Sequence, residues 1–245
     1  MSHPNPQNVL IVGGGDGAVL REVCLHPGVK SITVVEIDQK VIDVAKEFFS
    51  ETTATSFDDP RVTMVNEDAA DFLEKQNRSD RQGYDVIIAD SSDPVGPAES
   101  LFDPMFYEQM HEALNDGGII STQGDCFWTH PDLIENVVAC CADIFDVVEY
   151  ASAYVPTFPC GQVGFVLAGK GEGVSVRKPA RKMTKTLQQQ MQWYSPAVHS
   201  ASFVLPYFLE EKIAPLRPRP AEFDDDNEDT DVQDDDCFLQ GCSIS

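Results

Sequence analysis

The sequence has few basic residues for its length. Its 245 residues include 17 Lys and Arg against 41 Asp and Glu, which gives a formal net charge of −24. Nucleic-acid binding requires clustered Lys and Arg at the phosphates, so no nucleic-acid partner is expected. A cationic small molecule suits this charge better. Many of the acids lie in residues 222–236, a run without any base, and we expect residues 216–245 to form an acidic disordered tail.

Long apolar runs and paired cysteines are also missing. No apolar stretch approaches the length needed to cross a bilayer, and no signal-peptide pattern follows Met1. The seven cysteines are odd in number and none lies in a CxxC pair, so neither a disulfide framework nor a zinc site is indicated, and no metal is expected. We therefore expect a soluble, cytoplasmic protein.

Apolar residues make up 42% of the chain, which is enough for a globular core. Short apolar runs predict strands at residues 9–12, 32–35, 62–65, 84–89, 119–122, 147–151 and 163–168. Helical patterns fall between them at residues 18–25, 40–49, 69–75, 104–114 and 133–144. This alternation predicts an α/β domain over residues 1–170 with a doubly wound, mostly parallel, seven-stranded sheet.

Three local expectations follow from the same pattern. Residues 40–49 form a helix with Val41, Val44, Ala45 and Phe48 on one face. Gly117 and Gly118 are expected to end the helix before the fifth strand. Residues 171–215 are expected to be a helical extension that packs on the domain, with helices at residues 187–194 and 202–213.

The first predicted strand runs into a glycine-rich turn at residues 13–17, GGGDG. Ligands of open parallel sheets bind outside the carboxyl ends of the strands, and glycines such as Gly13 and Gly15 let the backbone approach a ligand closely. An aspartate inside the turn, Asp16, would repel a phosphate. The turn therefore favours a ligand that is cationic or rich in hydrogen-bond donors.

The next two strands also end near acids. Glu36 follows the second strand about 20 residues after the turn, where an acid accepts hydrogen bonds from ribose hydroxyls. Capping of the next helix is the alternative role, and Asp38 is better placed for it. Asp68 follows the third strand and could either accept the amine of an adenine or cap the helix at Ala69. The acids and the turn describe an adenosine site that suits S-adenosylmethionine-like molecules better than NAD.

The fourth strand leads into DSSDPVGPAESLF at residues 90–102, with Asp90 and Asp93 in a loop stiffened by two prolines. Alkyl transfer from a sulfonium to an amine requires a neutral amine, whereas a free alkylamine near neutral pH is almost entirely ammonium (compare lysine, pKa about 10.4). A carboxylate beside the sulfonium can bind the ammonium and take its proton. A second acid can anchor the other charged end of the substrate.

These motifs, with TQGDCFW at 122–128 and VPTFPCGQVGF at 155–165, resemble the spermidine synthase family over residues 2–170. The resemblance implies a Rossmann-like class I methyltransferase fold. It also implies transfer of the aminopropyl group of decarboxylated S-adenosylmethionine, a co-substrate rather than a bound cofactor, to putrescine or a related diamine. The products would be spermidine and methylthioadenosine.

The resemblance also assigns roles to single residues. Asp16 would contact the aminopropyl amine and Glu36 the ribose, and the adenine would meet Asp68 and the backbone of Ala69. Asp90 would be the proton acceptor. The contacts to the nucleoside co-substrate would come from Gly13, Gly15, Asp16, Glu36, Asp68, Ala69 and Asp90. The diamine would be bound by Asp93, Gln123 and Phe158.

The sequence departs from the family pattern at three places. The family's small N-terminal β-domain would precede residue 1, so we expect either a fragment of a longer chain or a truncated form. Phe158 replaces a tyrosine whose hydroxyl usually meets the diamine, and Ala69 replaces a frequent glycine. The alternatives are therefore an S-adenosylmethionine-dependent methyltransferase, or a non-catalytic partner of a full-length relative. A homodimer is a further expectation.

The last four residues, Cys242 to Ser245, fit a prenylation motif with Cys237 nearby. Membrane attachment is expected only if Cys242 carries a prenyl group.

Overall fold

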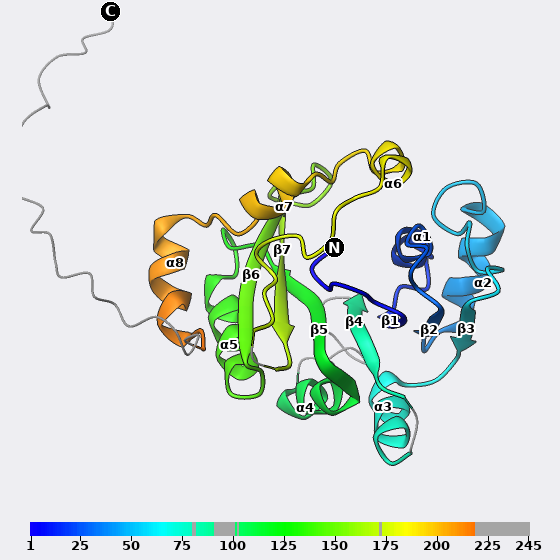
Figure 1. Ribbon diagram of the computed structural model, residues 1–245, viewed down its shortest axis with the longest axis horizontal. Helices are drawn as coiled ribbons and strands as arrows, with labels where there is room; N and C mark the ends of the chain where they lie inside the picture. Colours follow the sequence, from blue (N-terminus) through cyan, green and yellow to red (C-terminus); the bar gives the residue numbers. More distant parts are fainter. Residues whose placement is uncertain (80–81, 91–100, 102, 172, 219–245) are drawn as a thin grey trace, which may run out of the picture.

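The computed structural model describes residues 1–79, 82–90, 101, 103–171 and 173–218. In these residues one seven-stranded sheet has the order β3-β2-β1-β4-β5-β7-β6 (Figure 1). The strands are β1 (Asn8–Gly13), β2 (Ser31–Val35), β3 (Val62–Val65), β4 (Tyr84–Asp90), β5 (Leu114–Asp125), β6 (Val147–Tyr154) and β7 (Gln162–Gly169). Strand β7 runs antiparallel to both neighbours, and the pairs among β1 to β5 are parallel. The predicted doubly wound, methyltransferase-like sheet is confirmed.

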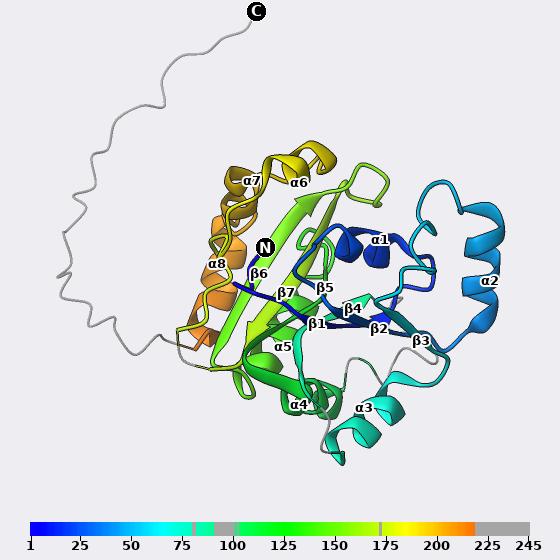
Figure 2. The ribbon, with the colours of Figure 1, turned by 45° about the vertical axis from the view of Figure 1, so that its right-hand side comes forward.

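Helices cover both faces of the sheet (Figures 1 and 2). They are α1 (Ala18–Cys24), α2 (Gln39–Phe48), α3 (Ala69–Asn77), α4 (Pro104–Ala113), α5 (Pro131–Ala142), α6 (Lys185–Gln190), α7 (Pro196–Ala201), α8 (Tyr207–Ile213) and the 3₁₀ turn η2 (Ala214–Leu216). On one face α1 and α2 pack on β1 and β2, and on the other α3, α4, α5 and α8 share one apolar core.

The alternation of side chains along β1 explains the two cores. Successive residues of a strand point to opposite faces. Val9 and Ile11 accordingly pack with α1 and α2, whereas Leu10 and Val12 belong to the core of α3, α4 and α5. A strand that is buried on both faces reads as a continuous apolar run, as VLIV does.

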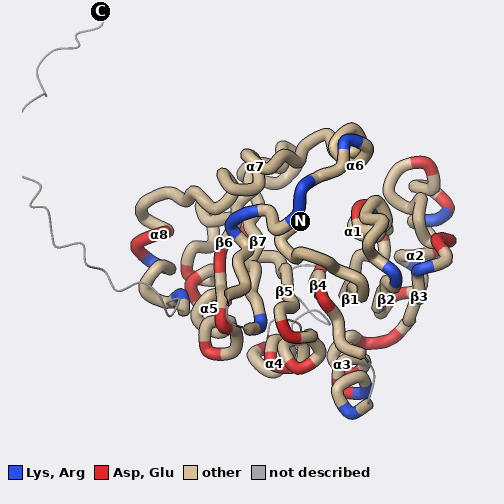
Figure 3. Tube along the Cα trace, viewed as in Figure 1, with Lys and Arg blue, Asp and Glu red and all other residues tan. Residues whose placement is uncertain are grey.

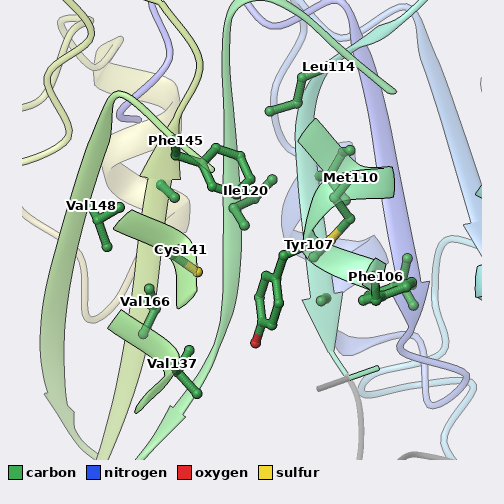
Figure 4. Packing of buried hydrophobic residues seen from close by; sticks show 14 of the residues in the cluster. Phe106, Tyr107, Met110, Leu114, Ile120, Val137, Cys141, Phe145, Val148 and Val166 are labelled. Atoms are coloured by element: carbon green, nitrogen blue, oxygen red, sulfur yellow. The ribbon is translucent and has the colours of Figure 1, made fainter. Parts of the chain in front are cut away.

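The larger core lies where α4 and α5 meet β5. Figure 4 shows Phe106, Tyr107 and Met110 of α4 on one side of Ile120, with α5 on the other. Phe106, Tyr107 and Met110 are at most 1% exposed. This packing fixes the position of β5 beside β4, and so the positions of the side chains at the ends of both strands.

Three local expectations were wrong in detail. Helix α4 ends at Ala113 and β5 begins directly at Leu114, so Gly117 and Gly118 lie inside an irregular stretch of the strand, where the register with β4 shifts. Gly117 has a φ of 79°, a conformation that favours glycine. The helix expected over residues 187–194 is α6, which begins at Lys185 and ends at Gln190. The helix expected over residues 202–213 begins only at Tyr207, as α8, because Pro206 disfavours a helical backbone at the residue before it.

Helix α2 forms as predicted, but most of the apolar side chains on its predicted face are exposed. Val41, Val44 and Phe48 are 42%, 48% and 68% exposed, while Ile42 and Ala45 are buried.

None of the helices in the described part of the chain has the length and hydropathy that crossing a bilayer requires. Most of the predicted acidic tail, with Cys237 and Cys242, lies outside the described residues.

Candidate active site

The glycine-rich turn lies where the strand order changes direction, between β1 and β4. Gly13 pairs with Asp90 across these two strands, and the amide of Gly14 donates to the carbonyl oxygen of Asp90 at 3.2 Å. Gly13, Gly14 and Gly17 have φ values of 74°, 68° and 83°, which other residues rarely adopt. The turn therefore needs glycines for its shape, and that shape brings the backbone against the end of β4.

Glu36 lies beneath this turn. Its Oε2 accepts a hydrogen bond from the amide of Gly15 at 3.1 Å, and its Oε1 accepts one from the amide of Asp38 at 2.9 Å. The side chain of Asp38 caps α2 by accepting from the amide of Lys40 at 2.8 Å. The structure thus separates the two acids as the sequence suggested, with capping left to Asp38.

Gly15 has no room for a side chain next to Glu36. A Cβ atom at position 15 would lie 2.7 Å from Oε2 of Glu36 and 2.9 Å from its Cγ. Glu36 is 8% exposed. Close approach, rather than positive φ, is therefore the reason for glycine at this position.

Asp16 lies within the turn, and Asp90 is the last residue of the neighbouring strand β4. Asp16 is exposed, and its Oδ1 accepts from the amide of Ala18 at 3.0 Å. Asp90 is half-buried at the end of β4. Burial raises the pKa of the Asp90 carboxyl, and the negative charges of Asp16 and Glu36 raise it further. Within the described chain, three acids from three elements therefore act on one small region.

Asp68 caps α3. Its Oδ1 accepts from the amides of Ala70 and Asp71 at 2.8 and 3.2 Å. Ala69, the first residue of that helix, is buried. The capping alternative is therefore realised at Asp68, and a contact with adenine would have to use the rest of the carboxylate.

The predicted diamine residues lie toward the other half of the sheet. Gln123 is half-buried near the end of β5, paired with Phe165 of β7. Phe158 lies in the turn between β6 and β7, where its amide donates to Val155 at 2.9 Å and its carbonyl accepts from Gly161 at 2.8 Å. Asp93, the third of these residues, lies outside the described residues.

One acid at this edge was not predicted from the sequence: Asp125, the last residue of β5. It has a φ of 54°, the left-handed region in which aspartate is tolerated. The hydroxyl of Tyr150 donates to its carbonyl oxygen at 2.8 Å, and its Oδ2 lies 3.1 Å from Nδ1 of His130. An acid two residues after Gln123 at the end of a strand was the available signal.

The charge around this edge is one-sided. No Lys or Arg lies between Arg81 and Lys170 in the sequence, so the elements from β4 to β7 carry Asp and Glu but no Lys or Arg (Figure 3). The described residues contain no group of three or more His, Cys, Asp or Glu placed to hold a metal ion. The site therefore offers carboxylates to a cationic ligand.

Comparison with known proteins gives this geometry a family. Residues 1–178 match the family model of the spermine/spermidine synthase domain. The chain belongs to the spermine/spermidine synthase family. The resemblance drawn from the motifs is confirmed, and with it the enzyme class, that of the polyamine aminopropyltransferases.

Individual members of the spermine/spermidine synthase family agree. The chain is 44% identical over 212 residues to the spermidine synthase of Dictyostelium discoideum, covering 86% of this chain and 72% of the relative. It is also 44% identical over 218 residues to the spermine synthase of Arabidopsis thaliana, covering 86% of this chain and 60% of the relative.

A solved spermidine synthase in complex with the transition-state analogue AdoDATO matches with a TM-score of 0.74 and 30% identity, over 87% of this chain and 71% of that one. The chain thus spans between 60% and 72% of the length of these three relatives.

Proposed function

We propose that this member of the spermine/spermidine synthase family transfers the aminopropyl group of decarboxylated S-adenosylmethionine to putrescine, giving spermidine and methylthioadenosine. The observation that carries the proposal is the grouping of Asp16, Glu36 and Asp90 at one edge of the sheet, where the charges that act on Asp90 are both negative. A ligand with a sulfonium and an ammonium group would relieve this repulsion.

The same charges favour the decarboxylated nucleoside over S-adenosylmethionine. The two molecules differ by a carboxylate on the chain attached to sulfur. That carboxylate would approach Asp16 and Asp90 and be repelled, whereas the bare aminopropyl ammonium would be attracted. This argument supports an aminopropyltransferase rather than a methyltransferase on the same fold.

The nucleoside would occupy the half of the site made by the turn, β2 and β3. The carboxylate of Glu36 is positioned by the amides of Gly15 and Asp38, which leaves it lone pairs for the ribose hydroxyls. Gly13 and Gly15 would let the turn lie against the nucleoside, and Asp68 with the amide of Ala69 would meet the adenine. The sulfonium would then lie near Asp90.

Asp90 would act as the proton acceptor. An amine attacks the carbon next to the sulfonium only in its neutral form, so a carboxylate must remove a proton from the ammonium. A raised pKa makes the Asp90 carboxylate a better base than that of an ordinary aspartate. Asp93, Gln123 and Phe158 would hold the remainder of the diamine.

The test is release of methylthioadenosine by the purified chain from decarboxylated S-adenosylmethionine and putrescine. Asp90→Asn should lower kcat by about 10²- to 10⁴-fold, the usual contribution of a general base. Asp143→Asn, at an exposed acid that ends α5, is the matched control and should leave the rate unchanged.

Two results would change the proposal. Faster turnover of spermidine than of putrescine would assign the chain to spermine synthesis, the activity named for the Arabidopsis thaliana relative. No methylthioadenosine at high enzyme concentration, together with a restored or altered rate when a full-length relative is added, would make the chain a non-catalytic partner.

A further inference from the structure

Two cysteines lie close together beside the predicted diamine half of the site. Cys126 directly follows β5 and is 1% exposed, while Cys160 lies in the turn between β6 and β7 and is exposed. Asp125 pairs with Gly164, and the amide of Phe127 donates to Oε1 of Gln162 at 3.2 Å. The two segments are thus joined directly beside Cys126 and two residues from Cys160, and the Cys160 thiol interacts with that of Cys126.

The other described cysteines do not offer such a pair. Cys140 and Cys141 are consecutive residues of α5, whose side chains do not face each other. Cys24 is at the end of α1, packed against the core of α1 and α2. Cys126 and Cys160 therefore stand apart from the rest as one buried and one accessible thiol in contact.

We propose that Cys126 and Cys160 form a reversible disulfide that fixes the turn at residues 155–161 to the end of β5. A peroxide would serve as oxidant. The exposed Cys160 thiolate attacks the peroxide, which gives a sulfenic acid on Cys160 and releases water. The Cys126 thiol then attacks that sulfur, the disulfide forms and a second water leaves. Overall, two thiols and one hydrogen peroxide give one disulfide and two waters.

A functional consequence follows if the proposed function holds. The turn carries Phe158, and the end of β5 carries Gln123, two of the residues expected to meet the diamine. A covalent bond between these segments would hold them at one separation and oppose entry or exit of the amine. The oxidised protein should therefore transfer aminopropyl groups more slowly, and a thiol reductant should restore the rate.

The reaction should be slow near neutral pH. Desolvation, the Cys126 thiol and the Asp125 carboxylate raise the pKa of the Cys160 thiol. Only the thiolate attacks a peroxide, so the rate of disulfide formation should increase as pH rises through and above the ordinary thiol range. This dependence on pH distinguishes the slow oxidation of these two thiols from that of a peroxide-sensing cysteine, which reacts rapidly at neutral pH.

The experiment treats the full chain with hydrogen peroxide and maps it without reduction. Trypsin cannot separate the two cysteines, because no Lys or Arg lies between Arg81 and Lys170. Chymotrypsin, which cuts after Phe127, Tyr154 and Phe165, does separate them. We expect one cross-linked peptide containing Cys126 and Cys160, lighter by two hydrogen atoms than the two free peptides together. Cys160→Ser should abolish it, and Cys140→Ser, the control, should not.

Several results would overturn the proposal. They are a cross-link from Cys160 to Cys237, Cys242 or a second chain, over-oxidised Cys160 with no cross-link, or a cross-linked peptide that persists in Cys160→Ser. The restraint on the turn has its own readout, because chymotryptic cleavage after the exposed Tyr154, where the turn begins, should become slower in the oxidised protein and stay unchanged in oxidised Cys160→Ser. A mapped disulfide in a chain without transferase activity would contradict the proposed function but would still support the proposed disulfide between Cys126 and Cys160.

Discussion

The carboxylates of Asp16 and Asp90 act on each other across the glycine-rich turn, and the negative charge of Asp16 raises the pKa of Asp90. One acid comes from the turn after β1 and the other from the end of β4. Their proximity follows from the pairing of Gly13 with Asp90, and it makes the pKa of the Asp90 carboxyl depend on the charge of Asp16.

Asp16→Asn should therefore shift the pH dependence of the reaction. Removing a negative charge lowers the pKa of Asp90, so the acidic limb of the profile of kcat/KM against pH should move to lower pH. The position of the limb is the measurement, since the height of the profile also falls with the loss of a contact to the aminopropyl amine. Asp143→Asn should leave the limb in place; an unmoved limb in Asp16→Asn would refute the coupling.

Asp90→Asn should stabilise the folded protein while it removes activity. The pKa of Asp90 is raised above its ordinary value of 3.8, so the ionised form costs free energy in the folded state. That cost is present above the raised pKa and disappears as pH falls below 3.8. The gain in Tm of Asp90→Asn should therefore be seen at pH 7 and shrink in acid.

Asp85→Asn supplies a control of opposite sign. Burial alone would raise the pKa of Asp85, but hydrogen bonds from the amide of Asn8, the side chain of Asn115 and the amide of Gln7 outweigh it and lower the pKa. Its stabilisation is present above pH 3.8 and lost as pH falls through the lowered pKa, so Asp85→Asn should reduce Tm at pH 7. Equal shifts for both variants would contradict the assignment.

Gly15→Ala should weaken binding of the nucleoside more than it destabilises the fold. The added Cβ would lie 2.7 Å from Oε2 of Glu36 and push the carboxylate off its place. Displacement of a positioning group by an ångström can lower the efficiency of a reaction by up to about 100-fold. We expect this effect to be a rise in KM for the nucleoside. A calorimetric titration with methylthioadenosine checks this, with Gly28→Ala as control, since a Cβ there comes no nearer than 3.9 Å to any atom.

Gly164→Ala should disturb the end of β5 through Tyr150. A Cβ at position 164 would clash with the hydroxyl oxygen of Tyr150, which donates to the carbonyl oxygen of Asp125 at 2.8 Å. Overpacking of this kind costs about 1–3 kcal/mol, measurable by chemical denaturation. Tyr150→Phe removes the hydroxyl but leaves the ring carbons Cζ and Cε2 too close to the added Cβ, so the double variant should be no more stable than Gly164→Ala alone.

Phe158→Tyr should improve binding of the diamine. A hydroxyl restored at this position would offer a hydrogen bond to a charged amine, worth about 1.5–3 kcal/mol, so KM for putrescine should fall by about tenfold while kcat stays similar. Steady-state kinetics with putrescine and spermidine measure both constants. An unchanged KM would place residue 158 away from the amine.

Most of the fold could be predicted because each strand is a short apolar run. In the parallel half of the sheet, an acid or a glycine lies at or just after the carboxyl end of each strand. Glu36 and Asp38 could even be separated, since a capping residue lies next to the helix it caps and Glu36 does not. The sheet topology then brings the ends of β1, β2 and β4 to one edge without any further information.

Other features depended on contacts between distant residues. The periodicity of α2 identifies an apolar side, but Val41 and Phe48 are exposed while Ile42 and Ala45 are buried, because the neighbouring strands rather than the helix decide which side is covered. The early start of β5 at Leu114 depends on pairing with Tyr84 of β4. The contact between Cys126 and Cys160 likewise needs the antiparallel register of β5 and β7.

The nucleoside half and the diamine half of the proposed site differ in how many amino-acid substitutions they can accept. A side chain at Gly14 would meet Ile11 at 3.1 Å and Asp90 at 3.4 Å, in a backbone conformation that already excludes most residues. Directed evolution of a new amine preference would find few viable substitutions at this turn. The exposed hairpin between β6 and β7 is where libraries should be concentrated.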